Sequence, residues 1–104
     1  MDIYSALADS TRRQIVEMLA AKGHLSASDI SNQFTMSAPA ISQHLKILRE
    51  SQVVTVEKKA QQRIYTINTS SISDIEHWVS KIRLQMEERY DRLDSLLKSE
   101  HKKK

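Results

Sequence analysis

Apolar and polar positions recur along this chain with two different periods, and the helical period covers most of it. A spacing of three and four residues between apolar positions predicts a helix, whereas strict alternation predicts a strand. The helical spacing occurs in a short segment ending at Leu7, in residues 10–21, after residue 26, in residues 37–51 and after residue 71. Alternation with β-branched enrichment occurs in residues 53–59 and 63–68. The pattern therefore predicts a mainly α-helical chain with one two-stranded hairpin.

Capping residues mark the ends of the early helices. Asp9 precedes the second helix, where its carboxylate can accept from the free amide hydrogens of the first turn. Gly23 is placed to end that helix in the left-handed conformation, which glycine adopts at little cost. Ser26 and Asp29 have the spacing of a capping box, so a short third helix is expected to start there.

The segment SAPAISQHLKILRES, residues 37–51, predicts an amphipathic fourth helix. Ser37 can cap it, and Pro39 lies in its first turn, where a missing amide hydrogen costs nothing. Three apolar residues at helical spacing form its expected buried side, namely Ile41, Leu45 and Leu48. Because a helix and a short turn precede it, the two helices are predicted to form a helix-turn-helix unit.

A long terminal helix is predicted from Ser71, which has capping-box spacing to Asp74, to about residue 99. Its apolar stripe has heptad-like spacing and consists of Ile72, Ile75, Val79, Ile82, Met86, Leu93 and Leu97. The stripe extends for about 28 residues, or roughly 42 Å at the helical rise, which is too long for so small a domain to cover. We therefore expect a second copy of the chain to cover it, with Ile3 and Leu7 as further candidates for the dimer interface. The alternative is that the helix folds back on its own core, partly through Ile75 and Trp78.

The length of 104 residues is that of a single domain, residues 1–104. The absence of cysteine excludes disulfides, thiolate metal sites and thiol-based redox sensing. With no signal-like segment and no apolar run that could span a bilayer, we expect a cytoplasmic protein with no membrane partner.

Residues 37–63 contain five Lys or Arg and two Asp or Glu, so the net charge of +3 is concentrated there while the two flanks cancel. An anionic partner would bind that segment.

The predicted order of four helices, a two-stranded wing and a long terminal helix is that of a winged helix-turn-helix. The strings ALADSTRRQIVEML, SAPAISQHLKILRES and RIYTIN resemble those of ArsR-type bacterial transcriptional regulators at the second helix, the recognition helix and the second wing strand. The resemblance runs from about residue 3 to the end of the wing, and the S-x-H-L-K-x-L core is its specific part. It implies a homodimeric repressor that binds an operator, its own operon being the first to consider, and that a signal releases. The chain departs from the ArsR pattern at Ala60 and at Ser51-Gln52, where glycine is frequent, which leaves the wing geometry and the end of the recognition helix open.

The polar side of residues 37–51 is the expected DNA-reading surface. Gln43 can present a donor and an acceptor to a base edge, preferentially adenine, while Ala38 and Ala40 let the backbone approach the groove closely. The side chains that suit phosphate oxygens are Ser37, Ser42, Lys46 and Arg49. Two interpretations of His44 stay open, a donor to DNA and a packed structural residue beside the apolar stripe. For the whole helix, an ordinary solvated face is the alternative.

The wing supplies further cations. Its end carries Lys58, Lys59, Gln61, Gln62 and Arg63. This end can lie along the DNA backbone, with its cations on phosphates or in the adjacent minor groove. A strand edge kept soluble by lysine is the structural alternative, and both can hold.

Arg12 and Arg13 begin the second helix, where the positive end of the helix dipole disfavours cations. Their position therefore predicts a partner of opposite charge. That partner is either a DNA phosphate or an acidic residue, with Glu17 and Asp9 as the candidates.

The residues do not support metal binding, which the ArsR resemblance raises as a question. Residues 25–30, LSASDI, lie where many ArsR-type regulators carry a cysteine pair, and they contain no thiol. Other ArsR-type regulators bind zinc between paired terminal helices. When their ligand positions are counted from Asp74, the matching residues here are Glu76, Glu87 and Tyr90. Zinc prefers His and Cys donors, and Asp74 with His77 makes at most half a site. We therefore expect no metal and no other cofactor.

An enzyme is not expected, since the chain has no glycine-rich phosphate loop, no paired-carboxylate motif and no cysteine nucleophile. The favoured function is that of a sequence-specific, double-stranded-DNA-binding transcriptional regulator. Two alternatives stay open: a winged-helix module that docks on an acidic protein, and a metal-responsive repressor of the same family. The sequence identifies neither the operator nor the releasing signal.

Overall fold

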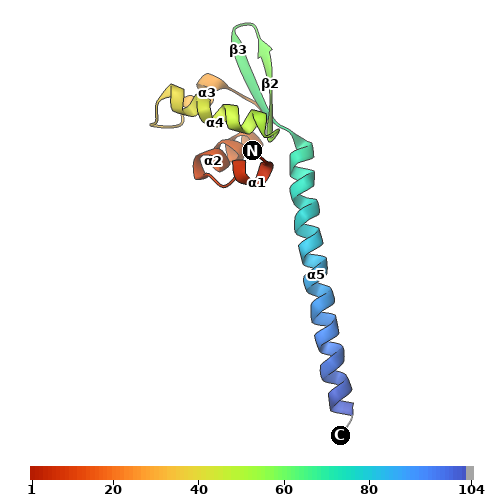
Figure 1. Ribbon diagram of the computed structural model, residues 1–104. Coiled ribbons are helices and arrows are strands. Elements are labelled where there is room, and N and C mark those ends of the chain that lie inside the picture. Colours follow the sequence, from red (N-terminus) through yellow and green to blue (C-terminus); the bar gives the residue numbers. More distant parts are fainter. Residues whose placement is uncertain (103–104) are drawn as a thin grey trace. The chain divides into compact units, whose positions relative to one another are not determined.

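The computed structural model describes residues 1–102, with side chains described through Ser99. Its elements, all but β1 labelled in Figure 1, are α1 (Ile3–Ala6), α2 (Ser10–Lys22), β1 (Leu25–Ser26), α3 (Ala27–Ser31), α4 (Ala38–Glu50), β2 (Val54–Lys59), β3 (Gln62–Ile67) and α5 (Thr69–Lys102). The chain divides into two compact units, Met1–Ile72 and the part from Ser73 onward. The winged helix-turn-helix plan with a long terminal helix is confirmed. None of the described helices is long and apolar enough to cross a membrane.

The predicted caps define α2, α3 and α4. Asp9 Oδ2 accepts from an amide of the first turn of α2 at 3.1 Å, and Gly23 ends that helix at a φ of 87°. Ser26 and Asp29 form a complete capping box, with bonds of 3.1 Å to Ser26 Oγ and 3.4 Å to Asp29 Oδ2. Ser37 Oγ accepts from an amide of the first turn of α4 at 3.3 Å. Both helices of the helix-turn-helix unit therefore begin at the predicted residues.

The wing belongs to a three-stranded sheet, whereas the pattern predicted two strands. β1 pairs antiparallel with β3, Leu25 opposite Tyr65 and Ser26 opposite Ile64, and the strand order is β1-β3-β2. A strand of two residues is too short to display alternation, so the pattern could not reveal it. Because Ser26 also caps α3, this strand attaches the wing to the helix-turn-helix unit.

One apolar core holds the first unit together. The buried apolar residues are Ala6, Ile15, Leu19, Ile30, Ile41, Leu45, Leu48, Val53, Val54 and Tyr65. The three residues predicted for the buried side of α4 are at most 3% exposed, so that prediction is confirmed. Burial of this side leaves the polar side of α4 in solvent.

Among the described residues, two other than glycine have a positive φ, Gln52 at 64° and Ala60 at 56°. The amide of Gln52 donates to the Arg49 carbonyl at 3.0 Å, and the amide of Val53 donates to the Leu48 carbonyl at 2.9 Å. This pair of bonds is the Schellman motif, in which glycine usually stands at the position of Gln52. Ala60 lies in the turn between β2 and β3. Both turns thus form without glycine, at a cost of about 1–2 kcal/mol per residue.

The terminal helix α5 begins earlier than predicted. Asn68 Oδ1 accepts from the amide of Ser70 at 3.2 Å and from its hydroxyl at 2.8 Å. Ser71, the predicted cap, is buried inside the first turn and donates its hydroxyl to the Asn68 carbonyl at 2.6 Å. The predicted start at Ser71 is therefore wrong, because the Asn68 amide bonds to the Val53 carbonyl at 2.9 Å and places the Asn68 side chain at the helix start.

Candidate nucleic-acid interface

The helix α4 presents its polar side to solvent. The exposed residues on and just before it include Ser37, Ala38, Ser42, Gln43, Lys46 and Arg49, while Ala40 is half-buried. The apolar residues between them pack on the core, so the backbone that carries these side chains is fixed. A rigid helix with an exposed amide and two exposed cations can bind both base edges and phosphate oxygens.

The hairpin brings cations of two strands together. The polar residues at its end, all exposed, are Lys58, Lys59, Gln61, Gln62 and Arg63. Lys58 lies directly opposite Arg63, and this pair follows Val56 and Tyr65 on the same face of the sheet. Within residues 1–99 neither cation of the pair has an ion-pair partner. Like charges directly opposite each other destabilise a sheet, and a bound anion would offset this repulsion.

A hollow of about 290 Å³ lies between α3, α4 and β3. Its lining includes Ala38 and Ser42 of α4 and Arg63 of β3, so the polar side of α4 and the cationic face of the hairpin meet there. Ser28 and Ser31 of α3 line the same hollow. The sequence did not indicate these two serines, because hydroxyl groups on a five-residue helix carry no recognisable pattern.

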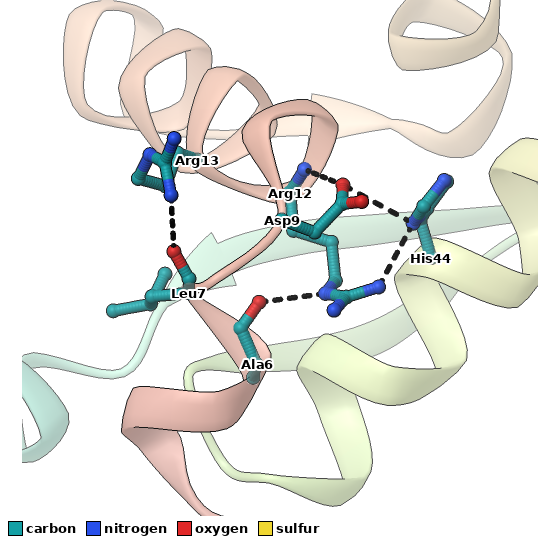
Figure 2. Close-up of polar contacts among 6 residues, drawn as sticks. All are labelled: Ala6, Leu7, Asp9, Arg12, Arg13 and His44. Atoms are coloured by element: carbon teal, nitrogen blue, oxygen red, sulfur yellow. Dashed lines mark hydrogen bonds and ion pairs between the residues drawn. The ribbon is translucent and has the colours of Figure 1, made fainter.

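His44 lies on the side of α4 that faces α2, as Figure 2 shows, and its side chain is 21% exposed. Its Nδ1 accepts a hydrogen bond from Arg12 Nη1 at 3.2 Å and lies 3.8 Å from Asp9 Oδ2. A guanidinium can only donate, so Nδ1 is the acceptor and the proton of the neutral ring is on Nε2. Of the two interpretations of His44, these contacts support the packed one.

The two arginines at the start of α2 bind backbone carbonyls of the preceding turn (Figure 2). Arg12 Nε donates to the Ala6 carbonyl at 2.6 Å, and Arg13 Nη1 donates to the Leu7 carbonyl at 2.8 Å. These carbonyls lie at the end of α1, where helical carbonyls lack partners and attract cations. In the described residues neither arginine forms an ion pair with Glu17, whereas the charge of Arg12 acts on Asp9, the other acidic candidate. Every residue has a backbone carbonyl, so the residue types could not indicate that carbonyls are the acceptors of these two arginines.

Asp9 remains charged within this cluster. The hydrogen bond from the Arg12 amide lowers the pKa of Asp9 below its ordinary value. The nearby charges of Arg12 and His44 lower this pKa further, while partial desolvation opposes them. The carboxylate is therefore ionised throughout the neutral pH range.

The residues weighed for metal binding lie along α5. Asp74, Glu76, Glu87 and Tyr90 are all exposed. Among the described residues, no group of three or more His, Cys, Asp or Glu is placed to hold a metal ion.

The residues predicted for the dimer interface differ in exposure. In α5, exposure is 40% at Val79, 38% at Ile82, 50% at Met86 and 52% at Leu93, while Ile72 and Ile75 are half-buried. Ile3 and Leu7 are half-buried and pack against the core of the first unit. The apolar stripe of α5 is thus a surface on which a partner could pack.

Comparison with known proteins gives one consistent family. Residues 9–56 match the family described as bacterial regulatory protein, arsR family. The chain is 36% identical over 78 residues to the transcriptional repressor SdpR of Bacillus subtilis (strain 168), covering 75% of this chain and 86% of SdpR. It is 34% identical over 73 residues to an arsenical resistance operon repressor of Staphylococcus aureus, covering 70% of this chain and 69% of that protein.

Solved structures give the same result. The crystal structure of an ArsR family transcriptional regulator matches with a TM-score of 0.75 and 27% identity, over 82% of this chain and 87% of the other. An ArsR-like transcriptional regulator from Rhodococcus sp. RHA1 matches with a TM-score of 0.82, over 93% of this chain and 88% of the other. At 23% identity, this second match bears on the fold alone.

Proposed function

The chain belongs to the arsR family of bacterial regulatory proteins, and from this premise we propose that it represses transcription as a homodimer bound to an operator. It is a DNA-binding transcriptional regulator, and its relatives are regulators rather than enzymes. The operator of its own operon is the first target to consider.

One observation carries the proposal: the exposed polar side of α4 and the Lys58–Arg63 pair border the same hollow through Ser42 and Arg63. A helix that enters the major groove and a hairpin beside it would then contact one stretch of duplex. The uncompensated Lys58–Arg63 pair suits the phosphate backbone, because phosphate supplies the anion that the described part of the chain does not.

Within α4 we assign base reading to Gln43. Its amide can donate and accept at once, which matches the edge of adenine in the major groove. Ala38 and Ala40 allow close approach of the helix. The assigned phosphate contacts are Ser37, Ser42, Lys46 and Arg49, which would fix the register of the helix without reading sequence.

The hairpin and α3 complete the proposed interface. Lys58, Lys59 and Arg63 are assigned to phosphates or to the adjacent minor groove, and Gln61 and Gln62 to the duplex surface at the hairpin end. The hydroxyls of Ser28 and Ser31 suit a phosphate that would lie in the hollow.

The proposed homodimer is formed by α5. Its exposed apolar stripe supports this assignment, because a single chain gains stability when such a stripe is covered. Two copies related by a twofold axis would present two recognition helices about 34 Å apart, one turn of the DNA helix.

A gel-shift titration tests the proposal. The full chain is titrated into a duplex taken from upstream of its own coding region and into a shuffled duplex of the same composition, at several salt concentrations. We expect the operator duplex to bind at least about a thousandfold more tightly, with log affinity falling linearly with log salt at about 0.9 per phosphate neutralised.

The competing function predicts another result. A winged-helix module that docks on an acidic protein would shift neither duplex at any salt concentration. Equal binding of both duplexes would support a DNA-binding protein without an operator in that region, and would contradict repression of its own operon.

A further inference from the structure

A chain of hydrogen bonds joins three helices through one side chain. Arg12 belongs to α2, yet its Nε binds the Ala6 carbonyl of α1 at 2.6 Å and its Nη1 binds His44 of α4 at 3.2 Å. Figure 2 shows the guanidinium between these two partners, with Asp9 beside the imidazole. The link reaches α4 through the residue next to Gln43 in the chain.

We propose that Arg12 and His44 are positioning residues for base reading, with the neutral imidazole of His44, held by Arg12, setting the direction in which Gln43 points. This role rests on the DNA binding proposed above. Adjacent residues lie 100° apart around a helix axis, so fixing His44 against α2 also fixes the direction of Gln43.

The physical reason lies in the kinds of contact that α4 makes. Its buried residues Ile41, Leu45 and Leu48 attach it to the core, but apolar contacts are not directional. A hydrogen bond requires a donor–acceptor distance near 3 Å and a favourable angle. The Arg12–His44 bond therefore adds a directional restraint on the rotation of α4 about its axis to the restraint that core packing gives. Base reading needs this restriction, since the contacts of Gln43 are hydrogen bonds themselves.

The link depends on the protonation state of His44. A neutral imidazole accepts at Nδ1, whereas an imidazolium carries hydrogens on both nitrogens and repels the guanidinium. The charged groups beside the ring are Arg12 of α2 and Asp9, which caps that helix. The residues one turn away along α4, on either side of His44, are Ala40, Ile41, Ile47 and Leu48, which are apolar.

Acidification would therefore exchange the partners of His44. A protonated ring loses the bond from Arg12 and is attracted to the Asp9 carboxylate, whose Oδ2 is 3.8 Å from Nδ1. Asp9 stays ionised, because folding lowers the pKa of its carboxyl group. Base reading weakens as a result, while binding to phosphates does not.

A direct contact of His44 with DNA predicts the opposite sign. An imidazolium that touched a phosphate would bind more tightly in acid, because it would add a charge-assisted hydrogen bond. The direction of the pH effect on operator binding therefore separates a positioning residue from a contact residue.

The test compares the full-length wild type with His44→Asn. The amide oxygen of Asn can accept from Arg12 near the place of Nδ1, and the amide has no titratable proton. The ratio of operator affinity to shuffled-duplex affinity is measured at constant salt between about pH 5.5 and 7.5. We expect the wild-type ratio to fall about tenfold towards the acid end, and the ratio of His44→Asn to change less than about twofold.

Two results would overturn the positioning role. One is a wild-type ratio that rises in acid, which indicates direct contact. The other is the same profile in both proteins, which shows that the pH effect does not arise at His44.

A measurement without DNA keeps the inference independent of the proposed function. Nitrogen NMR of the imidazole reports which ring nitrogen carries the proton. We expect a neutral His44 with the proton on Nε2 in the wild type, and a changed Nδ1 shift in a folded Arg12→Gln chain. Identical His44 shifts in the two chains would refute the link even if the operator is bound, whereas a wild type that binds no duplex refutes only the proposed function.

Discussion

Gln43 is the side chain on which the proposed sequence reading depends most. It is exposed on α4, and it is the one primary amide on that helix. Gln43→Ala should weaken operator binding by about 1–3 kcal/mol and leave binding to a shuffled duplex unchanged, because one bidentate base contact is lost. Gln14→Ala, at an exposed position of α2, is the matched control and should change neither. An equal loss on both duplexes in a gel shift would show that Gln43 does not read bases.

Lys59 is expected to act on the backbone alone. It is exposed at the end of β2, opposite Gln62. Lys59→Ala should weaken operator and shuffled duplex equally and reduce the salt slope by about one, because one phosphate contact disappears. Lys22→Ala, at the end of α2, removes the same charge outside the proposed interface and should leave the slope unchanged. A loss confined to the operator would instead assign Lys59 to base reading.

Asp9 contributes to folding through its charge and its cap. Asp9→Ala should lower the free energy of unfolding by about 1 kcal/mol at neutral pH, because an amide of the first turn of α2 loses its acceptor. Asp9→Asn keeps an acceptor and should cost less.

The pKa of Asp9 is lowered by folding, so the stability due to its charge is present above the pKa of the unfolded chain and is lost as pH falls through the folded pKa. Urea unfolding should therefore show that the free energy of unfolding differs less between wild type and Asp9→Asn in acid than at neutral pH. A difference that grows in acid would contradict this.

At the scale of the element, α4 ends in a strained backbone conformation that a substitution can relieve. Gln52 has a φ of 64° in a position where a Schellman motif favours glycine. Gln52→Gly should raise the free energy of unfolding by about 1 kcal/mol, because glycine adopts this conformation without a clash of Cβ. Gln52→Ala removes the same side chain but keeps Cβ, so it should give no such gain in chemical denaturation. Equal stabilities of the two variants would place the effect in the side chain rather than in the backbone.

Which elements the sequence could predict depends on the range of the interactions that define them. The caps at Asp9, Ser26 and Ser37 act within one turn, so neighbouring residues were enough to predict them. The strand β1 and the cap at Asn68 depend on pairing with β3 and on the Val53 carbonyl, which local patterns do not encode. Local signals thus predicted the helices, whereas the third strand and the start of α5 required the tertiary structure.

The same division applies to the candidate site. The exposed side of α4 could be predicted, because three apolar residues at helical spacing identify the opposite side as buried. The partners of Arg12 and His44 could not, since 32 residues separate them in the chain and one acceptor of Arg12 is a backbone carbonyl. Sequence reasoning therefore identified the side chains that face solvent and left open the contact that we propose orients them.

At the scale of the whole molecule, operator binding requires two recognition helices, and we expect α5 to bring them together. Ile82 and Met86 lie near the middle of its apolar stripe and are 38% and 50% exposed in the single chain. Replacing both by Glu would place two carboxylates where the partner should pack, and burying an unpaired charge costs several kcal/mol. Sedimentation of the double variant should show monomers where the wild type forms dimers. Its operator affinity should also fall, because each half-site would be bound separately.

A matched variant separates this interface from a general effect of charge. Ser80→Glu with Ser95→Glu adds the same two charges on sides of α5 that lie roughly 120° and 180° from the centre of the stripe, and both serines are exposed. This control should remain a dimer and bind the operator as the wild type does. If the variant at Ile82 and Met86 also remained a dimer, the interface would lie elsewhere, and Ile3 and Leu7 of the α1 region would be the next residues to replace. If both double variants became monomers, charge repulsion along α5 rather than loss of apolar packing would explain the effect, and the stripe would no longer be the assigned interface.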